Sequence, residues 1–365
     1  MKRLTLILTI LVAAASCALS AADAPKRHGW RDWIDRPMGP LYGNVESVTI
    51  TSYFLKDSSG VLSRSESFKL CYNFNESGDV TERVQYTSDG TLYWREIYKY
   101  DTKGNNTEEA MYYSNGSLRE KSTYKYDTKG NKTEAAWYNS DGSLRGKHTF
   151  KYDTKGNNTE DASYNSNGSL NDKKIYKYDT KGNNTEKAEY NSDGSLRNKK
   201  IYKYDTKGNN TEEADYNSNG SLDYKYIYKY DTKGNNIEKA YYSPNGSLIN
   251  KRIYKYDTKG NNTETAEYNP NGSLNWKEIY KYDTKGNETE VASYNSDGSL
   301  RNKKICKYDK KGNKTEEARY ASDGLKHKVT YKYDSQGNIT ELTECYAYMQ
   351  IPESQVFTYT IIYRK

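Results

Sequence analysis

The sequence is poor in the residues that build thick aliphatic cores and in those that perform catalysis. Its 365 residues include only 3 histidines, 4 cysteines, 6 prolines and 5 phenylalanines, and hydrophobic residues make up 34%. It contains no GxSxG, HExxH, GxxxxGK[ST] or CxxC sequence, which are signatures of hydrolases, zinc proteases, phosphate-binding loops and redox or zinc sites. We therefore expect no enzyme and no cofactor.

Metal and disulfide chemistry also lack a basis in the sequence. His28, His148 and His327 are isolated, whereas metal sites need clustered ligands at defined spacing, so we expect them to be solvated or filler residues. If Cys17 is lost or lipidated, an odd number of cysteines remains, without framework spacing. We therefore predict no disulfide framework.

A repeated phrase accounts for most of the chain. Its clearest copy runs from Asp179 to Tyr204, DTKGNNTEKAEYNSDGSLRNKKIYKY, and it recurs every 26 residues. A degenerate copy begins at Asn75, and the copy at Asp334 arrives one residue early. A fixed period of this size indicates a repeat architecture. The chain contains 40 tyrosines in a largely polar background, and aromatic residues recurring in register argue against disorder.

Two turn signals divide each copy into two strands. Asp179 to Gly182 and Asn191 to Gly194 both place Asp or Asn first and Gly fourth, the chemistry of a hairpin turn closed by a glycine bulge. The intervening segments, 183–190 and 195–204, have ordinary strand lengths. The fold class expected is all-β: an antiparallel β-meander of about twenty strands, in a coiled or spiralling ribbon because strand twist accumulates.

Counting outward from the turns predicts a register and therefore two faces. Asp179 opposes Asn183, Asn191 opposes Ser195, and regular pairing then places Tyr190 across from Leu196, Ala188 from Asn198, Glu186 from Lys200 and from Tyr176, and Asn184 from Tyr202 and from Tyr178. One face would collect tyrosines and the other the basic residues typified by Lys199 and Lys203. The tyrosine face is a candidate ligand platform, although cross-strand packing explains the same rings: Tyr176, Tyr178, Tyr190, Tyr202, Tyr204, Tyr216, Tyr228 and Tyr230.

The flanking segments complete the predicted organisation. Residues 1–22 carry two basic residues, an apolar run and then small residues, the pattern of a signal peptide. Residues 23–43 form an irregular lead or tether, 44–74 an N-terminal capping hairpin, 75–345 the repeat array and 346–365 a C-terminal capping strand, because terminal repeats must close the stack. We predict export to the periplasm, the cell surface or the medium, with two alternatives for processing: cleavage near Ala22, or lipid attachment at Cys17.

The charge balance restricts the partners only weakly. The formal net charge of +7 is a mild bias over a chain of this length and gives little reason to expect nucleic acid. Contact with a membrane is expected only through a lipid anchor on Cys17. A glycan or an envelope protein remains a candidate partner, because evenly spaced rings can stack on sugars.

The turn sequence resembles a known family. The Y-D-x-x-G core followed by Thr, as in Tyr178, Asp179, Gly182 and Thr185, is similar to the YD repeats of the RHS family, over roughly residues 72–340. That resemblance implies an exported β-sheet protein whose strands wind into a spiral or shell, with a role in carbohydrate binding or in enclosing toxins; this chain carries no toxin-like region after Asp334. WYNSDGSL at Trp137 to Leu144 is more weakly similar to choline- or glucan-binding cell-wall repeats.

The function expected from these features is a non-enzymatic, exported interaction scaffold of the cell envelope or secreted space. Two alternatives remain open: a carbohydrate-binding module, and a component related to RHS-type toxin or adhesin systems. The choice depends on what the two faces of the ribbon carry.

Overall fold

The computed structural model describes residues 41–58, 61–346 and 354–364. All regular secondary structure in these residues is β, with 24 strands and no helix, so the predicted all-β class is confirmed. No helical segment in the described ranges could span a bilayer. The predicted signal peptide, most of the lead and the Cys17 lipidation site lie outside the described residues.

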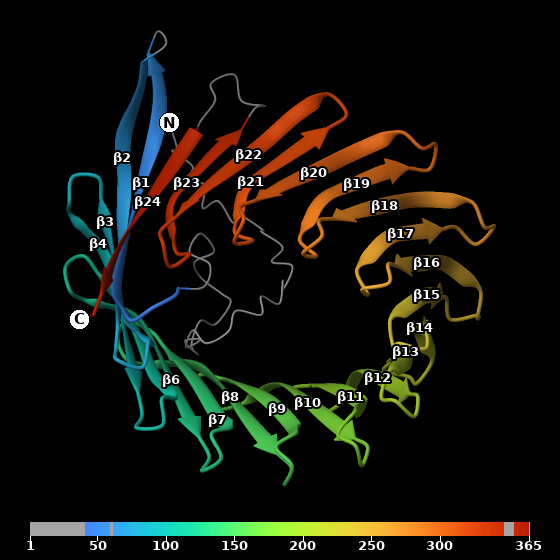
Figure 1. Cartoon of the computed structure of the whole chain (residues 1–365). Helices are drawn as coiled ribbons and strands as arrows, with labels where there is room; N and C mark the ends of the chain where they lie inside the picture. Colours follow the sequence, from blue (N-terminus) through green and yellow to red (C-terminus); the bar gives the residue numbers. More distant parts are fainter. Residues whose placement is uncertain (1–40, 59–60, 347–353, 365) are drawn as a thin grey trace, which may run out of the picture. The chain divides into compact units, whose positions relative to one another are not determined.

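Each copy of the repeat forms two strands separated by its two turns, as predicted, and consecutive strands form antiparallel hairpins (Figure 1). Their bounds are β1 Val45–Ser58, β2 Val61–Phe74, β3 Val80–Thr87, β4 Leu92–Tyr100, β5 Asn106–Tyr113, β6 Leu118–Tyr126, β7 Lys132–Tyr138, β8 Leu144–Tyr152, β9 Asn158–Asn165, β10 Leu170–Tyr178, β11 Asn184–Asn191, β12 Leu196–Tyr204, β13 Asn210–Asn217, β14 Leu222–Tyr230, β15 Asn236–Tyr242, β16 Leu248–Tyr256, β17 Asn262–Tyr268, β18 Leu274–Tyr282, β19 Glu288–Asn295, β20 Leu300–Tyr308, β21 Lys314–Ala321, β22 Gly324–Tyr333, β23 Ile339–Tyr346 and β24 Ser354–Tyr363.

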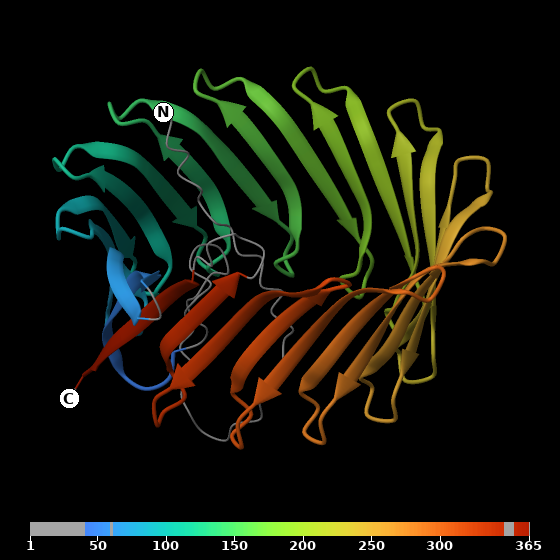
Figure 2. The same cartoon turned by 90° about the horizontal axis from the view of Figure 1, so that it is seen from above.

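The chain divides into two compact units. Of the described residues, one unit comprises those up to 92, 307–317 and those from 327 onward, and therefore contains both ends of the described chain. The other comprises 93–306 and 318–326 and contains most of the repeats. In the second unit, strands β5 to β19 and most of β20 follow one another in chain order and change direction gradually, so this ribbon coils rather than lying flat (Figure 2).

Glycine fixes both turn families. Gly182 and Gly194 have φ of 90° and 83°, a left-handed conformation that glycine adopts without steric cost. The backbone amides of Asp179 and Asn191 donate to the carbonyls of Asn183 and Ser195 at 3.0 and 2.9 Å. The predicted turns and the pairing next to them are confirmed.

The register beyond the turns differs from the prediction. The pairs of Tyr190 with Leu196 and of Tyr178 with Asn184 are present, but a bulge beside each then shifts the pairing by one residue. The bulges leave Arg197 and Thr185 without a directly opposite partner. A one-residue shift moves every later side chain to the other face relative to its predicted neighbours.

The predicted cross-strand neighbours and faces therefore need correction. Ala188 faces Lys199 rather than Asn198, and Glu186 faces Ile201 and Lys177 rather than Lys200 and Tyr176. Tyr190 shares a face with Ala188, whereas Tyr202, next to Ile201, points to the other face. The prediction that tyrosines gather on one face and lysines on the other is wrong.

The unit containing both chain ends has the larger hydrophobic core. β1 pairs with β2 on one side and with β24 on the other, and β24 also pairs with β23. Val48 of β1 is fully buried, and Tyr72 of β2 and Val356 of β24 are each 1% exposed. The chain therefore concentrates its aliphatic packing where its first and last strands meet.

Hydrogen bonds connect the segments at the two ends of the described chain. The buried Asn338 amide receives the Tyr42 backbone N–H at 2.6 Å and donates to the Tyr363 hydroxyl at the same distance. The Arg364 guanidinium donates to the carbonyls of Phe74 and Asn75. The last DSQGN turn of the array is thus held by residues from both flanking segments.

His327 is half-buried, against a buried carboxylate of this unit. The Nε2 atom of His327 is 2.7 Å from Oε1 of Glu344, a carboxylate that is 2% exposed and also accepts from the Tyr346 hydroxyl at 2.9 Å. The imidazole of His327 stacks on the Tyr346 ring with centroids 4.5 Å apart. His28 lies outside the described residues.

Candidate binding face

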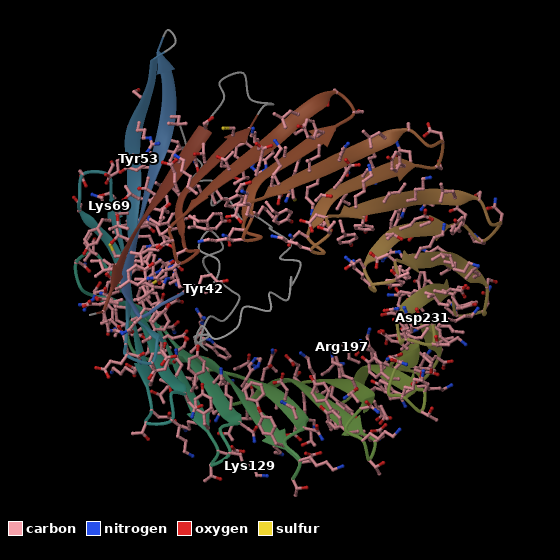
Figure 3. All side chains as sticks on the ribbon, viewed as in Figure 1. Tyr42, Tyr53, Lys69, Lys129, Arg197 and Asp231 are labelled. Carbon is pink, nitrogen blue, oxygen red and sulfur yellow. The ribbon has the colours of Figure 1, made fainter. Side chains whose placement is uncertain are left out.

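The ribbon of β5 to β20 is one sheet thick, with side chains on both of its sides (Figure 3). We call one side the framework face; in the copy from Asp179 to Tyr204 it carries Glu186, Ala188, Tyr190, Lys199, Ile201 and Lys203. The opposite side, called the variable face, carries Lys187, Glu189, Asn198, Lys200 and Tyr202. Both assignments follow from the observed register and the alternation of side chains along a strand.

The framework face is nearly the same in every copy between Asp101 and Tyr308. The columns of Glu186, Ala188, Tyr190, Lys199 and Lys203 do not change, and the Ile201 column holds only Ile or Thr. The alanines are 0 to 2% exposed. A small residue at this position lets the longer neighbouring side chains cover the sheet.

Ion pairs run across the framework face from strand to strand. Nζ of Lys177 lies 2.8 Å from Oε1 of Glu186, and Glu290 contacts Lys281 and Lys303 at 2.9 and 2.8 Å. The bonds from Lys303 and Lys281 hold the pKa of the Glu290 carboxyl below its usual range. Each exposed pair contributes at most about 1 kcal/mol, but the pattern is repeated in every copy.

The tyrosines that close each copy have a structural task at the edge of the ribbon. The Tyr204 hydroxyl donates to the Asn184 carbonyl at 2.7 Å, beside the bulge. The bond recurs in Tyr178 and Tyr230. Lys181 Nζ donates to the Thr206 carbonyl of the next turn at 2.8 Å, so consecutive DTKGN turns are joined along this edge.

The variable face differs from copy to copy. Along β5 to β20 the Lys187 column reads Glu, Ala, Asp, Lys, Glu, Lys, Thr, Val, and the Glu189 column reads Met, Trp, Ser, Glu, Asp, Tyr, Glu, Ser. The Asn198 and Lys200 columns vary as widely, and only the Tyr202 column is nearly constant. Trp94, Trp137 and Trp276 all lie on this face.

The densest feature of the variable face is a tyrosine cluster on β14 and β15. The rings of Tyr226 and Tyr241 stack with centroids 4.9 Å apart at 23°. Tyr224 meets both of them edge-on, at 5.5 and 5.8 Å. Lys239 Nζ lies 4.0 Å from the centroid of Tyr226. All of these side chains are half-buried, so part of each is open to a partner.

Cations surround the tyrosine cluster, and their environments differ. Burial opposes the charge on Lys200, but hydrogen bonds to Tyr224 and Glu213 raise the pKa of its ammonium overall. Burial lowers the pKa of Lys239. Arg252 lies over the Trp276 ring at 5.4 Å and pairs with Glu267 at 2.8 Å. The cluster therefore combines aromatic surface with cationic donors whose pKa values differ, since that of Lys200 is raised and that of Lys239 is lowered.

The predicted ligand platform is split by this arrangement. Tyr190 and Tyr216 lie on the framework face, and Tyr178, Tyr204 and Tyr230 use their hydroxyls to bond the backbone. The remaining members, Tyr176, Tyr202 and Tyr228, lie on the variable face. Burial raises the pKa of Tyr176 to about 12, so its hydroxyl stays protonated at neutral pH and can donate.

The residues that distinguish one copy from another were not singled out from the sequence. Tyr224, Tyr226, Tyr241 and Arg252 replace different residues in neighbouring copies, and only the observed register places them together. Column-by-column comparison of the copies contains this signal: varied columns alternate with constant or nearly constant ones from Glu186 to Tyr190 and from Asn198 to Ile201.

Other chemistry is sparse in the described part of the chain. Residues 41–58, 61–346 and 354–364 contain no group of three or more His, Cys, Asp or Glu side chains that could hold a metal ion. Cys71 and Cys345 are free thiols, and Cys306 is buried. His148 contacts the ring of Trp137 and lies 3.4 Å from Asp161.

The chain is distantly similar to several known structures. No protein-family model and no curated protein matches it. It is similar to a chain in a structure of the Photorhabdus luminescens Tc holotoxin pore, with a TM-score of 0.42 and 14% identity, over 84% of this chain and 17% of that one. It is also similar to a chain in the crystal structure of TcdB2-TccC3, with a TM-score of 0.34 and 13% identity, over 84% of this chain and 21% of that one. The chain thus spans about a fifth of the length of these two.

A porin-like protein from Bacteroides uniformis is similar with a TM-score of 0.25 and 10% identity, over 87% of this chain and 96% of that one. At these identities and TM-scores, the likenesses carry no argument about function.

Proposed function

We propose that this protein is a non-enzymatic, exported scaffold of the YD-repeat type that presents its variable face to other macromolecules. The observation that supports this function most directly is the contrast between the faces. Copies that are the same in every framework column except one differ in most columns on the opposite side. In repeat proteins a constant framework supports stacking, while the exposed positions are available for recognition.

Binding tests can separate the two faces. The proposed variant replaces five variable-face residues with side chains that other copies carry in the same columns, so the fold should tolerate them: Trp137→Ser, Tyr226→Lys, Tyr241→Glu, Arg252→Lys and Trp276→Asn. The framework control is Tyr138→Phe with Tyr242→Phe. We expect saturable binding of the native chain to envelope extract from the producing cells, reduced at least tenfold in the first variant and unchanged in the control.

Equal binding by all three proteins, or none above background, would contradict the scaffold function. Export is tested separately by mass spectrometry of the mature N-terminus. Cleavage near Ala22 or a lipid on Cys17 supports it, and an unprocessed Met1 in the mature protein contradicts it.

Carbohydrate binding is the second candidate, favoured by the stacked Tyr226 and Tyr241 rings and their neighbouring donors. Sugars stack on aromatic rings, so saturable binding to an oligosaccharide array that is lost on Tyr226→Ala would support it. Loss of binding to glycans in the control Tyr242→Phe as well would point to a general loss of structure.

A further inference from the structure

We infer that the variable face recognises a polypeptide with a non-repeating surface, and not a polymer of identical units. This inference rests on the proposed scaffold function and specifies its partner. It depends on the order of side chains along β5 to β20, which the register now places on one face.

A periodic partner and a non-periodic partner make different demands on a repeat array. A polymer of identical units offers the same group to each copy with which it is in register, and its contacts therefore favour the same side chain in each copy. The variable columns do the opposite: residues 137, 163, 189, 215 and 241 occupy one column and are Trp, Ser, Glu, Asp and Tyr. Only a surface that itself changes along its length can match such a series.

The side chains form successive patches of different chemistry. On β7 and β8, Trp137 meets His148 edge-on, with ring centroids 5.1 Å apart. On β9 and β10 the patch is acidic and polar, and the Ser163 hydroxyl donates to Asp172 at 2.7 Å.

Further along the ribbon the character changes again. β14 and β15 present the stacked tyrosines, and β16 to β18 present Arg252 over Trp276. A partner that pairs in this order with an aromatic patch, an acidic and polar patch, a second aromatic patch and then the Arg252, Glu267 and Trp276 patch must have a defined, non-repeating surface.

The composition of the varied positions also fits a protein partner. Tryptophan, tyrosine, arginine and methionine are enriched in protein–protein interfaces, where a few such residues dominate the binding energy. The array places Met111, Trp137, Tyr241 and Trp276 at variable positions and holds them half-buried. A partly buried ring loses little conformational freedom on binding, which favours affinity.

Site-specific photo-crosslinking in the producing cells tests this inference. A photoreactive phenylalanine analogue is placed at Trp137 or Tyr241 on the variable face, and at the adjacent Tyr138 or Tyr242 on the framework face as a matched control. We expect one predominant adduct at the variable positions, at least tenfold above the controls. Mass spectrometry of the digested adduct should find peptides of a second protein joined to the labelled peptide, and periodate oxidation of sugars should leave the adduct unchanged.

A second protein exchanges residues 127–152 with residues 231–256. The exchange keeps the constant framework columns, the turns and the composition, but reorders the patches; circular dichroism and the melting temperature verify that the fold is retained. We expect the yield of the adduct formed from the photoreactive residue in place of Tyr241 to fall at least tenfold, because the patches of the array no longer stand in the order that the partner matches. If the exchanged array does not fold, the peptides found in the adduct of the native array and its response to periodate still decide the partner class.

The outcomes separate the inference from the function on which it rests. An adduct at the variable positions that contains glycan, or one unaffected by the exchange in a folded protein, overturns the polypeptide partner and leaves the scaffold function standing. No adduct above the framework controls overturns both.

Discussion

At the scale of single residues, the tyrosines of the three repeated columns occupy three different environments. Those of the Tyr204 column bond a carbonyl beside a bulge, those of the Tyr190 column cover the framework face, and those of the Tyr202 column lie on the variable face. A residue type that looks uniform in the sequence therefore serves different purposes, because its position relative to the bulge decides which face and which partner it has.

The bulge-capping role predicts a difference between two tyrosine-to-phenylalanine variants. Tyr204→Phe removes the 2.7 Å bond to the Asn184 carbonyl and should lower the free energy of unfolding by about 1 kcal/mol, the net contribution of one such bond. Tyr216→Phe, on the framework face, is the matched control and should change stability little. Urea denaturation followed by circular dichroism measures both, and equal effects would contradict the bulge-capping role.

The turn carboxylates predict acid sensitivity. Hydrogen bonds from Asn183 hold the pKa of Asp179 below 3.8, and Ser195 does the same for Asp193. Because these folded-state pKa values are depressed, the unfolded chain binds protons first, and stability is lost as the pH falls. The melting temperature should be nearly constant from about pH 7 to pH 5 and should fall below about pH 4.

A matched variant isolates part of this effect. Asn occupies the Asp193 position in other copies, as in Asn167 and Asn219, so the triple change Asp141→Asn, Asp193→Asn and Asp297→Asn keeps the turn and removes three titrating groups. Its melting temperature should decline less steeply below about pH 4. A decline as steep as in the native chain would show that these carboxylates do not contribute.

At the scale of the hairpin, the backbone conformation of the turn glycine can be tested directly. Gly208 has φ of +89° and its missing Cβ would meet only an Asn183 side-chain atom at 3.8 Å, so the cost of substitution is conformational rather than steric. Gly208→Ala should destabilise the array by about 1 to 2 kcal/mol. Gly208→Asn should cost less, because asparagine tolerates this region.

Thermal unfolding of the two variants decides the point. Equal losses from Ala and Asn would indicate that crowding, and not the left-handed backbone, governs the turn.

Much of the hairpin could be predicted from the sequence. The period, the turns and the strand bounds follow from local chemistry, since Asp or Asn at the first position and Gly at the fourth act within a few residues. The register could not be counted outward, because each bulge inserts a residue that only the cross-strand contacts reveal. A clue was available: the unchanged columns of Lys177 and Glu186 have opposite charge, and they pair directly in the structure.

The candidate site was correspondingly harder to predict than the fold. The sequence identified tyrosines as ring platforms, yet assigned Tyr190 and Tyr202 to one face when they lie on opposite faces. Once the true register is known, four varied columns and the nearly constant Tyr202 column lie on one side, and the constant framework columns lie on the other. The proposed recognition surface thus consists of positions that differ between copies, and these positions lie on one face only when the observed register is applied.

At the scale of the whole chain, β24 should be indispensable. It pairs with both β1 and β23 and buries Val356 and Phe357. Removing residues 354–365 would expose two strand edges together with core side chains, and unpaired edges promote aggregation. We expect the truncated protein to elute as aggregates in size-exclusion chromatography with light scattering.

The control for this truncation is Ile362→Ser, which changes a side chain of β24 that is 51% exposed and keeps the strand paired. It should elute as the native chain does. Monomeric behaviour of the truncated protein would show that β24 is dispensable for the core.

The pairing of β1 with β24 also has a consequence for the order in which the protein can fold. The repeat hairpins join neighbouring segments, and such contacts form within microseconds. The Arg364 guanidinium and the Val45 carbonyl that it contacts are 319 positions apart in the chain, and closing so long a loop costs more entropy than closing a hairpin. During synthesis β1 and β2 emerge long before β24, so the edge of β1 that pairs with β24 stays without this partner until residues 354–363 have been made.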